Sequence, residues 1–162
     1  MMAERQIASF YVGNDFLGVD VRLVREIHKC TEITPVSPAP DYVAGLLNLR
    51  GQIVTVIDLG LRIGIKRQKH GTCANCVVLK TSRELDAMAL PEILDDGTGP
   101  DQVAFLVDTI GDIVIIDPSL IVPPPAHVGA VEGRFLSGVA KLDGQLLVTL
   151  KVSEILRLED VV

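Results

Sequence analysis

Short apolar runs separated by turn residues occupy most of the chain. Residues 6–12 and 16–20 flank Gly13-Asn14-Asp15, and this pattern predicts a β-hairpin. Further runs rich in β-branched residues predict strands at residues 52–57, 76–80, 103–107, 110–116, 137–142 and 145–150. Many short strands with Gly, Pro, Asn and Asp between them are typical of a barrel or sandwich, not of alternating β-α-β units. The pattern therefore predicts a mostly β fold.

The helices are expected to be few and short. The spacing of apolar residues over 21–27 predicts a short helix, and Asp41 is placed to cap another over residues 42–47. Asp58 ends a strand and is expected to cap a single turn that runs through Ile63. Residues 153–156 predict a helix that closes the fold.

A faint internal repeat joins two of the predicted hairpins. Residues 45–54 align without gaps on residues 138–147, so that the glycines, a leucine before the turn and a glutamine after it coincide. The repeat indicates two related half-barrels, although any two hairpins of a β protein can look alike. The second copy turns at Asp143-Gly144, a favoured pair, whereas the first has Arg50, which turn chemistry does not select. Arg50 is therefore either an ordinary solvated arginine or a rigidly mounted guanidinium that pairs with a carboxylate.

Composition narrows the class of protein. The 162 residues are 48% apolar, which suits a single domain over 1–162 with a good core. No apolar run is long enough to cross a membrane, and no signal-peptide core follows the N-terminus, so a soluble cytoplasmic domain is expected. The net charge of −6 and the 4% aromatic content argue against nucleic-acid binding. The three cysteines are expected to be free thiols in a reducing cytoplasm.

Residues 82–101 form an acidic excursion between two predicted strands. Six acids against one base give this segment a charge of −5 and leave the rest of the chain near −1. The excursion is either a solvated mobile loop or a docking surface for a basic partner. A basic stretch, Arg62, Lys66, Arg67 and Lys69, could neutralise it within the chain.

No catalytic motif is found. The chain has no phosphate loop, dinucleotide-binding turn or nucleophile elbow, and Asp58, Asp108 and Asp117 are expected to cap or turn at strand ends. One constellation, His70-x-x-Cys73-x-x-Cys76, has residues that suit zinc or redox chemistry, but a fourth ligand is missing and Cys76 opens a strand. Structural thiols are favoured there. We therefore expect no cofactor, no metal and no enzymatic activity, and a protein that binds other proteins.

The chain resembles the CheW family, the coupling proteins of bacterial chemotaxis. The most specific stretch is residues 40–59, which contains the turn Asn48-Leu49-Arg50-Gly51. Supporting segments that also fit are residues 18–21, 24–27, 105–113, 121–125 and 135–139. Together they extend the resemblance over nearly all of residues 9–158.

The resemblance implies two intertwined five-stranded SH3-like β-barrels with short helices and a C-terminal helix. It also implies a non-enzymatic adaptor between the cytoplasmic tip of methyl-accepting chemoreceptors and the regulatory domain of the histidine kinase CheA. Such an adaptor is recruited to membrane-associated receptor arrays without inserting into the membrane, and it forms rings with other CheW-like domains.

The resemblance also assigns a binding site. Arg50 matches the family's receptor-facing arginine and Glu26 its acidic neighbour. The other receptor- or kinase-binding positions are apolar or small residues: Val24, Ile27, Gly45, Gly51 and Ile110. An exposed apolar groove of this kind would accept a helical hairpin of the receptor.

Three departures from the family pattern limit the transfer. Thr55 stands where the family usually has proline, which does not threaten the fold, and the 82–101 excursion replaces a much shorter turn. The histidine-cysteine stretch precedes a strand that helps to line the groove, which leaves the chemistry there open. The excursion could select partners, so one alternative is a CheW-like scaffold of a gliding, pilus or other non-flagellar two-component pathway. A less favoured alternative is a metal- or redox-responsive switch that uses His70, Cys73 and Cys76.

Overall fold

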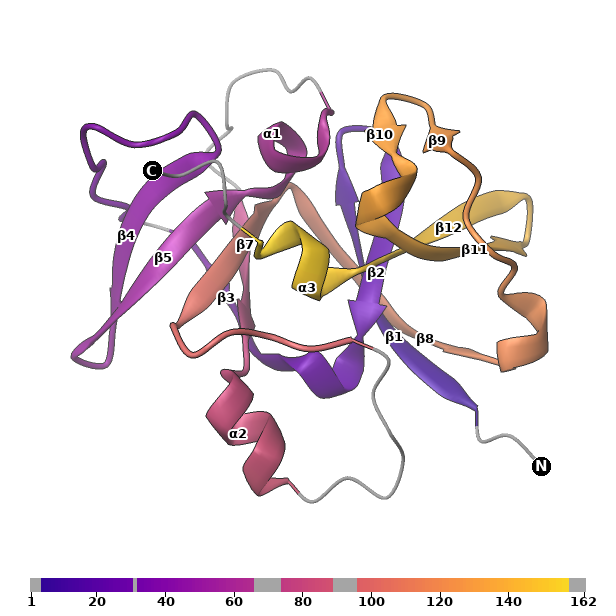
Figure 1. Ribbon diagram of the computed structural model, residues 1–162, viewed down its shortest axis with the longest axis horizontal. Helices are drawn as coiled ribbons and strands as arrows, with labels where there is room; N and C mark the ends of the chain where they lie inside the picture. Colours follow the sequence, from indigo (N-terminus) through magenta and orange to yellow (C-terminus); the bar gives the residue numbers. More distant parts are fainter. Residues whose placement is uncertain (1–3, 31, 66–73, 89–95, 158–162) are drawn as a thin grey trace.

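The computed structural model describes residues 4–30, 32–65, 74–88 and 96–157 (Figure 1). Strands dominate, as the sequence predicts, and they form two five-stranded sheets. The first sheet consists of β11 (Leu136–Leu142), β12 (Gln145–Leu150), β2 (Asp15–Asp20), β1 (Arg5–Val12) and β8 (Thr109–Ile116), in that order. The second consists of β4 (Val43–Leu49), β5 (Gln52–Asp58), β7 (Val103–Val107), β6 (Asn75–Leu79) and β3 (Val24–Lys29).

The remaining elements are short. A two-stranded ribbon is formed by β9 (His127–Val128) and β10 (Val131–Glu132). The α-helices are α1 (Leu59–Ile63), α2 (Ser82–Ala87) and α3 (Val152–Ile155). The 3₁₀ segments are η1 (Val21–Leu23), η2 (Pro118–Leu120) and η3 (Gly133–Phe135).

The two sheets share one connectivity and exchange strands. In each, a hairpin (β11–β12 or β4–β5) pairs in parallel with the next strand (β2 or β7), and two antiparallel strands follow. The chain passes from β2 in the first sheet to β3 in the second, and from β7 back to β8, so the two units are intertwined. In Figure 1 the two hairpins lie on opposite sides of the molecule, with α3 between them. The pairings confirm two intertwined five-stranded units, and their closure into barrels stays a prediction.

The internal repeat extends to the irregularities of the hairpins. Gly45 and Gly138 each lie at a register shift of the ladder. The residue after each glycine forms an isolated bridge with an earlier segment, through Thr34 in one copy and Val122 in the other. A side chain at Gly45 would overlap the carbonyl oxygen of Thr34, and one at Gly138 would come within 3.0 Å of that of Val122. The resemblance between the hairpins is therefore structural and not a coincidence of turn residues.

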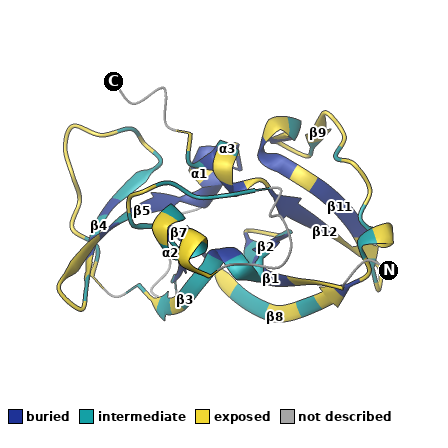
Figure 2. Cartoon of the chain, turned by 60° about the horizontal axis from the view of Figure 1, so that its bottom comes forward, coloured by how far each residue is buried: buried dark blue, intermediate teal, exposed yellow. Residues whose placement is uncertain are grey.

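One hydrophobic cluster spans both sheets. Phe10 and Leu17 from the first sheet pack with Ile57 and Phe105 from the second and with Ile155 of α3. Each of these side chains is at most 1% exposed. Figure 2 shows the buried residues on the facing strands and the exposed residues along the outer side of β8. The shared cluster therefore joins the two sheets, and each sheet also buries a smaller apolar cluster of its own.

Of three local predictions, two are wrong and one is confirmed. Residues 24–27 are wrong as a helix, because only Val21–Leu23 form a 3₁₀ turn and the rest belongs to β3. Residues 42–47 are also wrong as a helix, because Val43–Leu49 form β4 and pair along their length with β5. Tertiary pairing overrides the weak helical pattern in both cases. Asp58 does cap α1, since its Oδ1 accepts a hydrogen bond of 3.2 Å from the Leu61 N–H.

The described parts of the acidic excursion are attached to the fold. Thr81 and Glu84 form a capping box at the start of α2. At the other end, Asp96 accepts hydrogen bonds from the N–H groups of Val152 (2.5 Å) and Ser153 (2.7 Å) at the start of α3. At these two ends the excursion is therefore a short helix and a hydrogen-bonded segment, and the choice between a solvated excursion and a docking surface stays open. Residues 89–95 lie outside the described part of the chain.

Candidate functional site

The turn between β4 and β5 presents Arg50 on a defined backbone. Arg50 (φ 52°) and Gly51 (φ 84°) both have positive φ, as the primed hairpin turns require. Asp143 (φ 43°) and Gly144 (φ 82°) have the same geometry in the repeated hairpin. Asn48 supports the first turn, because its Oδ1 accepts a hydrogen bond of 2.9 Å from the Gly51 N–H. Arg50 thus occupies a position that turn chemistry would give to Asp or Asn.

Arg50 is paired with Glu26 across 24 positions of the sequence. Its Nη1 and Nη2 donate hydrogen bonds of 2.9 Å to Glu26 Oε2 and Oε1, which is the bidentate geometry of a guanidinium and a carboxylate. The Arg50 side chain is 68% exposed, whereas that of Glu26 is only 20% exposed. Of the two alternatives left by the sequence, the structure shows the rigidly mounted guanidinium.

The electrostatics of this pair follow from its contacts. The hydrogen bond from Arg50, followed by that from His28, lowers the pKa of Glu26 from its ordinary value of 4.5 to about 2. The Glu26 carboxylate in turn raises the pKa of Arg50. His28 reaches the carboxylate through Nε2, which contacts Glu26 Oε1. Glu26 is therefore ionised, and Arg50 paired with it, throughout the physiological pH range.

Arg25 connects this pair to the acidic excursion. Its Nε lies 3.6 Å from Glu26 Oε2, and its Nη1 donates to Glu84 Oε1 of α2 at 3.2 Å. Its Nη2 donates to Gln102 Oε1 at 3.1 Å, and Gln102 Nε2 donates to Gln52 Oε1 at 2.8 Å, next to the Arg50 turn. Sequence reasoning did not pair Arg25 with Glu84, because the two residues are 59 positions apart and no local pattern connects them.

The apolar residues of the predicted site lie in different parts of the fold. Ile27 follows Glu26 on β3 and is 43% exposed. Val24 and Ile110 are partly buried and pack against the shared cluster, Val24 from β3 and Ile110 from β8 of the other sheet. Gly45 lies at the β4 bulge beside Thr34. The structure thus pairs Glu26 with the arginine of the Arg50-Gly51 turn, and it places the other predicted positions on β3, β4 and β8.

Two of the cysteines are bonded, which corrects the expectation of free thiols. The structure has a Cys30–Cys76 disulfide with a Cα–Cα distance of 5.7 Å, within the ordinary range. The pairing of β3 with β6 brings the two residues together, and their separation of 46 positions hides this in the sequence. His70 and Cys73 lie outside the described residues. Within the described ranges no cluster of three or more His, Cys, Asp or Glu is arranged to hold a metal ion.

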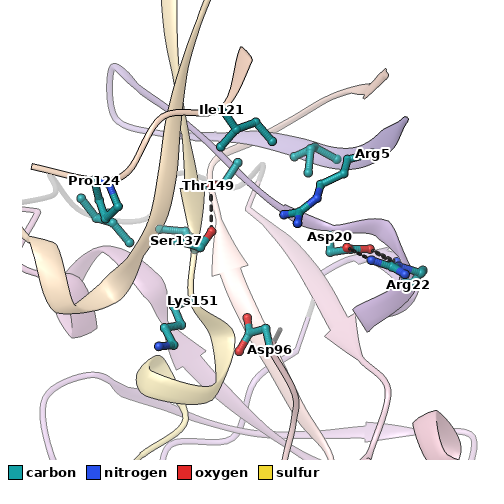
Figure 3. A pocket seen from close by; sticks show the side chains of 12 residues that line it. Arg5, Asp20, Arg22, Asp96, Ile121, Pro124, Ser137, Thr149 and Lys151 are labelled. Atoms are coloured by element: carbon teal, nitrogen blue, oxygen red, sulfur yellow. Dashed lines mark hydrogen bonds and ion pairs between the residues drawn. The ribbon is translucent and has the colours of Figure 1, made fainter. Parts of the chain in front are cut away.

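A cavity of about 380 Å³ lies at the end of the first sheet, away from the predicted site residues (Figure 3). Its polar walls bond to one another: Arg22 pairs with Asp20, with Nη2–Oδ2 at 2.6 Å, and Ser137 Oγ donates to Thr149 Oγ1 at 2.8 Å. Asp96 also lines it and bonds the start of α3. The described residues that line this cavity include no histidine or cysteine. Of its lining side chains, Asp96 attaches the excursion to the start of α3.

The strand-end aspartates act as the sequence predicts. Asp117 caps η2 by accepting a hydrogen bond of 2.9 Å from the Ser119 N–H, which lowers the pKa of Asp117. Asp108 Oδ2 accepts one of 2.6 Å from the Gly13 N–H in the β1–β2 turn.

In the portion of the chain that the structure describes, no helix has the length and apolar character needed to cross a membrane.

These features define the class of protein: a doubled β scaffold on which an arginine of a hairpin turn pairs with a glutamate of another strand. The CheW-like domain family matches residues 6–160, so the chain belongs to the CheW-like family. Its relatives include the chemotaxis protein CheW of Rhizobium meliloti (strain 1021), 26% identical over 156 residues, 96% of this chain and 90% of that protein. Chemotaxis protein CheW of Klebsiella aerogenes is 26% identical over 151 residues, 93% of this chain and 81% of that protein.

A solved structure supports the fold. The scaffolding protein TtCheW of Thermoanaerobacter tengcongensis superposes with a TM-score of 0.79 at 24% identity, covering 98% of this chain and 95% of that one. The doubled sheet architecture is therefore shared with a known scaffolding protein. The comparisons confirm the CheW-like family and the mostly β fold.

Proposed function

We propose that this chain is a non-enzymatic adaptor that couples the cytoplasmic tip of transmembrane chemoreceptors to the regulatory domain of a CheA-type histidine kinase. It acts in the cytoplasm and is recruited to receptor arrays, in which it associates with other CheW-like domains. Membership of the CheW-like family and the chemotaxis names of its relatives support this proposal.

The observation that carries the proposal is the exposed Arg50–Glu26 pair. Ion pairing fixes the direction of the guanidinium while most of its surface stays in solvent. A fixed, exposed cation suits a helical partner that carries a carboxylate. We assign partner contact to Val24, Glu26, Ile27, Gly45, Arg50, Gly51 and Ile110.

The test replaces Arg50 with alanine and measures co-sedimentation with receptor cytoplasmic fragments and kinase. We expect R50A to weaken recruitment about tenfold, typical of a truncated interface arginine. Its melting temperature should be nearly unchanged, because exposed ion pairs contribute little to stability. The matched control is R134A, which removes an arginine paired with Glu132 (3.0 Å) elsewhere on the surface. Equal recruitment by R50A and R134A would refute the proposal.

A second candidate partner set is favoured by the excursion. Because Glu84 on α2 bonds Arg25 next to Glu26, this acidic element lies beside the proposed contact surface. The chain would then serve a different two-component pathway, such as gliding or pilus motility, as a CheW-like scaffold. Preferential binding to the receptors and kinase of such a pathway over flagellar ones would favour this candidate.

A further inference from the structure

The Cys30–Cys76 disulfide lies at the end of the strand that carries Glu26. Cys30 directly follows β3, and Cys76 is the register partner of His28 across the β3–β6 ladder. His28 contacts the carboxylate of Glu26, and that carboxylate holds Arg50. A covalent bond is thus connected to the Arg50–Glu26 pair through one short stretch of strand.

The Cys30–Cys76 disulfide affects the conformation of β3 because of the position of that strand in the sheet. Within the described residues β3 is a terminal strand of its sheet and pairs with β6. Just beyond β3, the chain is held to β6 by the hydrogen bond of 3.1 Å from the Cys30 N–H to the Ala74 carbonyl and by the disulfide. Strand ends with a neighbour on one side open at low free energy. The disulfide therefore restricts how far the end of β3, with His28, can move from β6.

The two sulfur atoms differ in access. Cys76 is fully buried in the cluster formed by Leu47, Val54 and Val78, whereas Cys30 is half-buried at the edge of that cluster. Thiol–disulfide exchange needs a thiolate to approach the sulfur that it attacks. Exchange with a small thiol therefore takes place at Cys30. Disulfides of proteins in a reducing cytoplasm are commonly transient or redox-sensing, and not permanent.

We propose that Cys30 and Cys76 form a reversible thiol–disulfide site, with a low-molecular-weight thiol and its disulfide as reactants. Oxidation fixes β3 in the conformation that holds Glu26 against Arg50. The consequence for partner binding rests on the proposed function, since it assumes that this pair contacts the partner. Fixing the strand in advance lowers the conformational entropy lost on binding, so the oxidised protein binds its partner more tightly.

Oxidation proceeds in two balanced exchanges. The Cys30 thiolate attacks one sulfur of a small disulfide RSSR, so that a Cys30–S–S–R bond forms, the RS–SR bond breaks and one RSH leaves with a proton. The Cys76 thiolate then attacks the Cys30 sulfur, forms the Cys30–Cys76 bond and releases the second RSH. The two protein thiols lose two electrons and two protons, and one RSSR becomes two RSH. Reduction reverses both steps and begins with attack of a thiolate on Cys30.

The experiment compares the full chain equilibrated with oxidised or reduced glutathione. Alkylation and peptide mapping identify which cysteines are linked, and the NMR signal of the Arg50 Nε–H reports the ion pair without any partner. Titration with a receptor cytoplasmic-tip fragment then gives the affinity. C30S removes the pair, and C73S is the matched control that keeps it. Should C30S not fold, the comparison of oxidised with reduced wild type carries the test.

We expect oxidised wild type and C73S to contain the Cys30–Cys76 link and to bind the fragment about fivefold more tightly than their reduced forms, at the low end of typical site coupling. C30S should match the reduced protein under both conditions. The same Arg50 signal in both states, equal affinities, or a link through Cys73 instead would overturn the proposal. A redox-dependent Arg50 signal with no fragment binding in either state would refute the proposed function and leave the thiol–disulfide site standing.

Discussion

Arg62 joins the two sheets, and replacing it tests how they are held together. The side chain lies on α1 and is 7% exposed. Its Nε and Nη2 donate hydrogen bonds to the carbonyls of Ile155 (2.9 Å) and Arg157 (2.8 Å), at the end of α3. Its guanidinium also lies over two rings, 5.1 Å from that of Tyr42 and 5.0 Å from that of Phe135. Tyr42 precedes the second sheet's hairpin and Phe135 the first sheet's, so one cation connects both halves.

The magnitude follows from these contacts. Arg62→Met keeps an unbranched apolar stem but removes the donors and the charge. A hydrogen bond from a charged group contributes about 1.5–3 kcal/mol, and a cation over an aromatic ring about 0.5–1 kcal/mol. Interactions that share one side chain do not add fully. We therefore expect R62M to lower the free energy of unfolding by about 3–5 kcal/mol.

Urea unfolding followed by circular dichroism measures this loss. With a slope of about 2 kcal/mol per molar, the R62M midpoint should fall by about 1.5–2.5 M. The control is R134M, because Arg134 lies over the same Phe135 ring (4.4 Å) but its side chain is 50% exposed. R134M should cost less than about 1 kcal/mol. R62K keeps the charge and provides an intermediate if R62M does not fold. Losses that are equal for R62M and R134M would refute the reasoning.

Two further predictions concern the repeat and the ion pair. Gly45→Ala should destabilise the protein by about 3 kcal/mol or more, because φ is +149° and the new methyl group meets the Thr34 carbonyl. The control G144A, at φ +82° and in open space, should cost about 1 kcal/mol. Equal urea midpoints for the two variants would contradict this prediction. Glu26 has a folded-state pKa of about 2 against its ordinary 4.5, so its contribution to stability is present above pH 4.5 and lost as pH falls through 2. The difference in unfolding free energy between wild type and E26Q should therefore shrink as the pH is lowered from 4.5 to 2. A difference that does not depend on pH would show that ionisation of Glu26 does not cause it.

Much of the fold could be predicted because strand patterns and turn residues are local. The β1–β2 hairpin follows from two short apolar runs around Gly13-Asn14-Asp15, and the β4–β5 and β11–β12 hairpins from the aligned repeat. The helical pattern over residues 42–47 failed because Leu46 and Leu47 suit either periodicity, and pairing with β5 decided between them. Helix α2 was missed because its charged residues show no apolar face; the structure buries none of its side chains.

The missed contacts of the site are long-range in sequence. Glu26 was found only through the family resemblance, since nothing local indicates that a β3 residue pairs with the β4–β5 turn. Cys30 and Cys76 could not be paired, because the register of β3 on β6 depends on the whole sheet. Arg62 was grouped with a basic stretch that could neutralise the acidic excursion, although it is buried between two rings. In each case the residue can be identified in the sequence, but its partner is determined by how the strands and helices pack together.

The duplicated hairpin explains why the arginine can be exposed without being mobile. Asp143 and Arg50 share one backbone geometry, and in the second hairpin Asp143 meets the demand of the turn with its own residue type. In the first hairpin Asn48 takes over that task by accepting from the Gly51 N–H. The turn residue is thereby released from turn formation, and its long side chain reaches Glu26 on another strand. Strand pairing fixes both ends of this ion pair, so the guanidinium keeps its direction while most of its surface faces solvent.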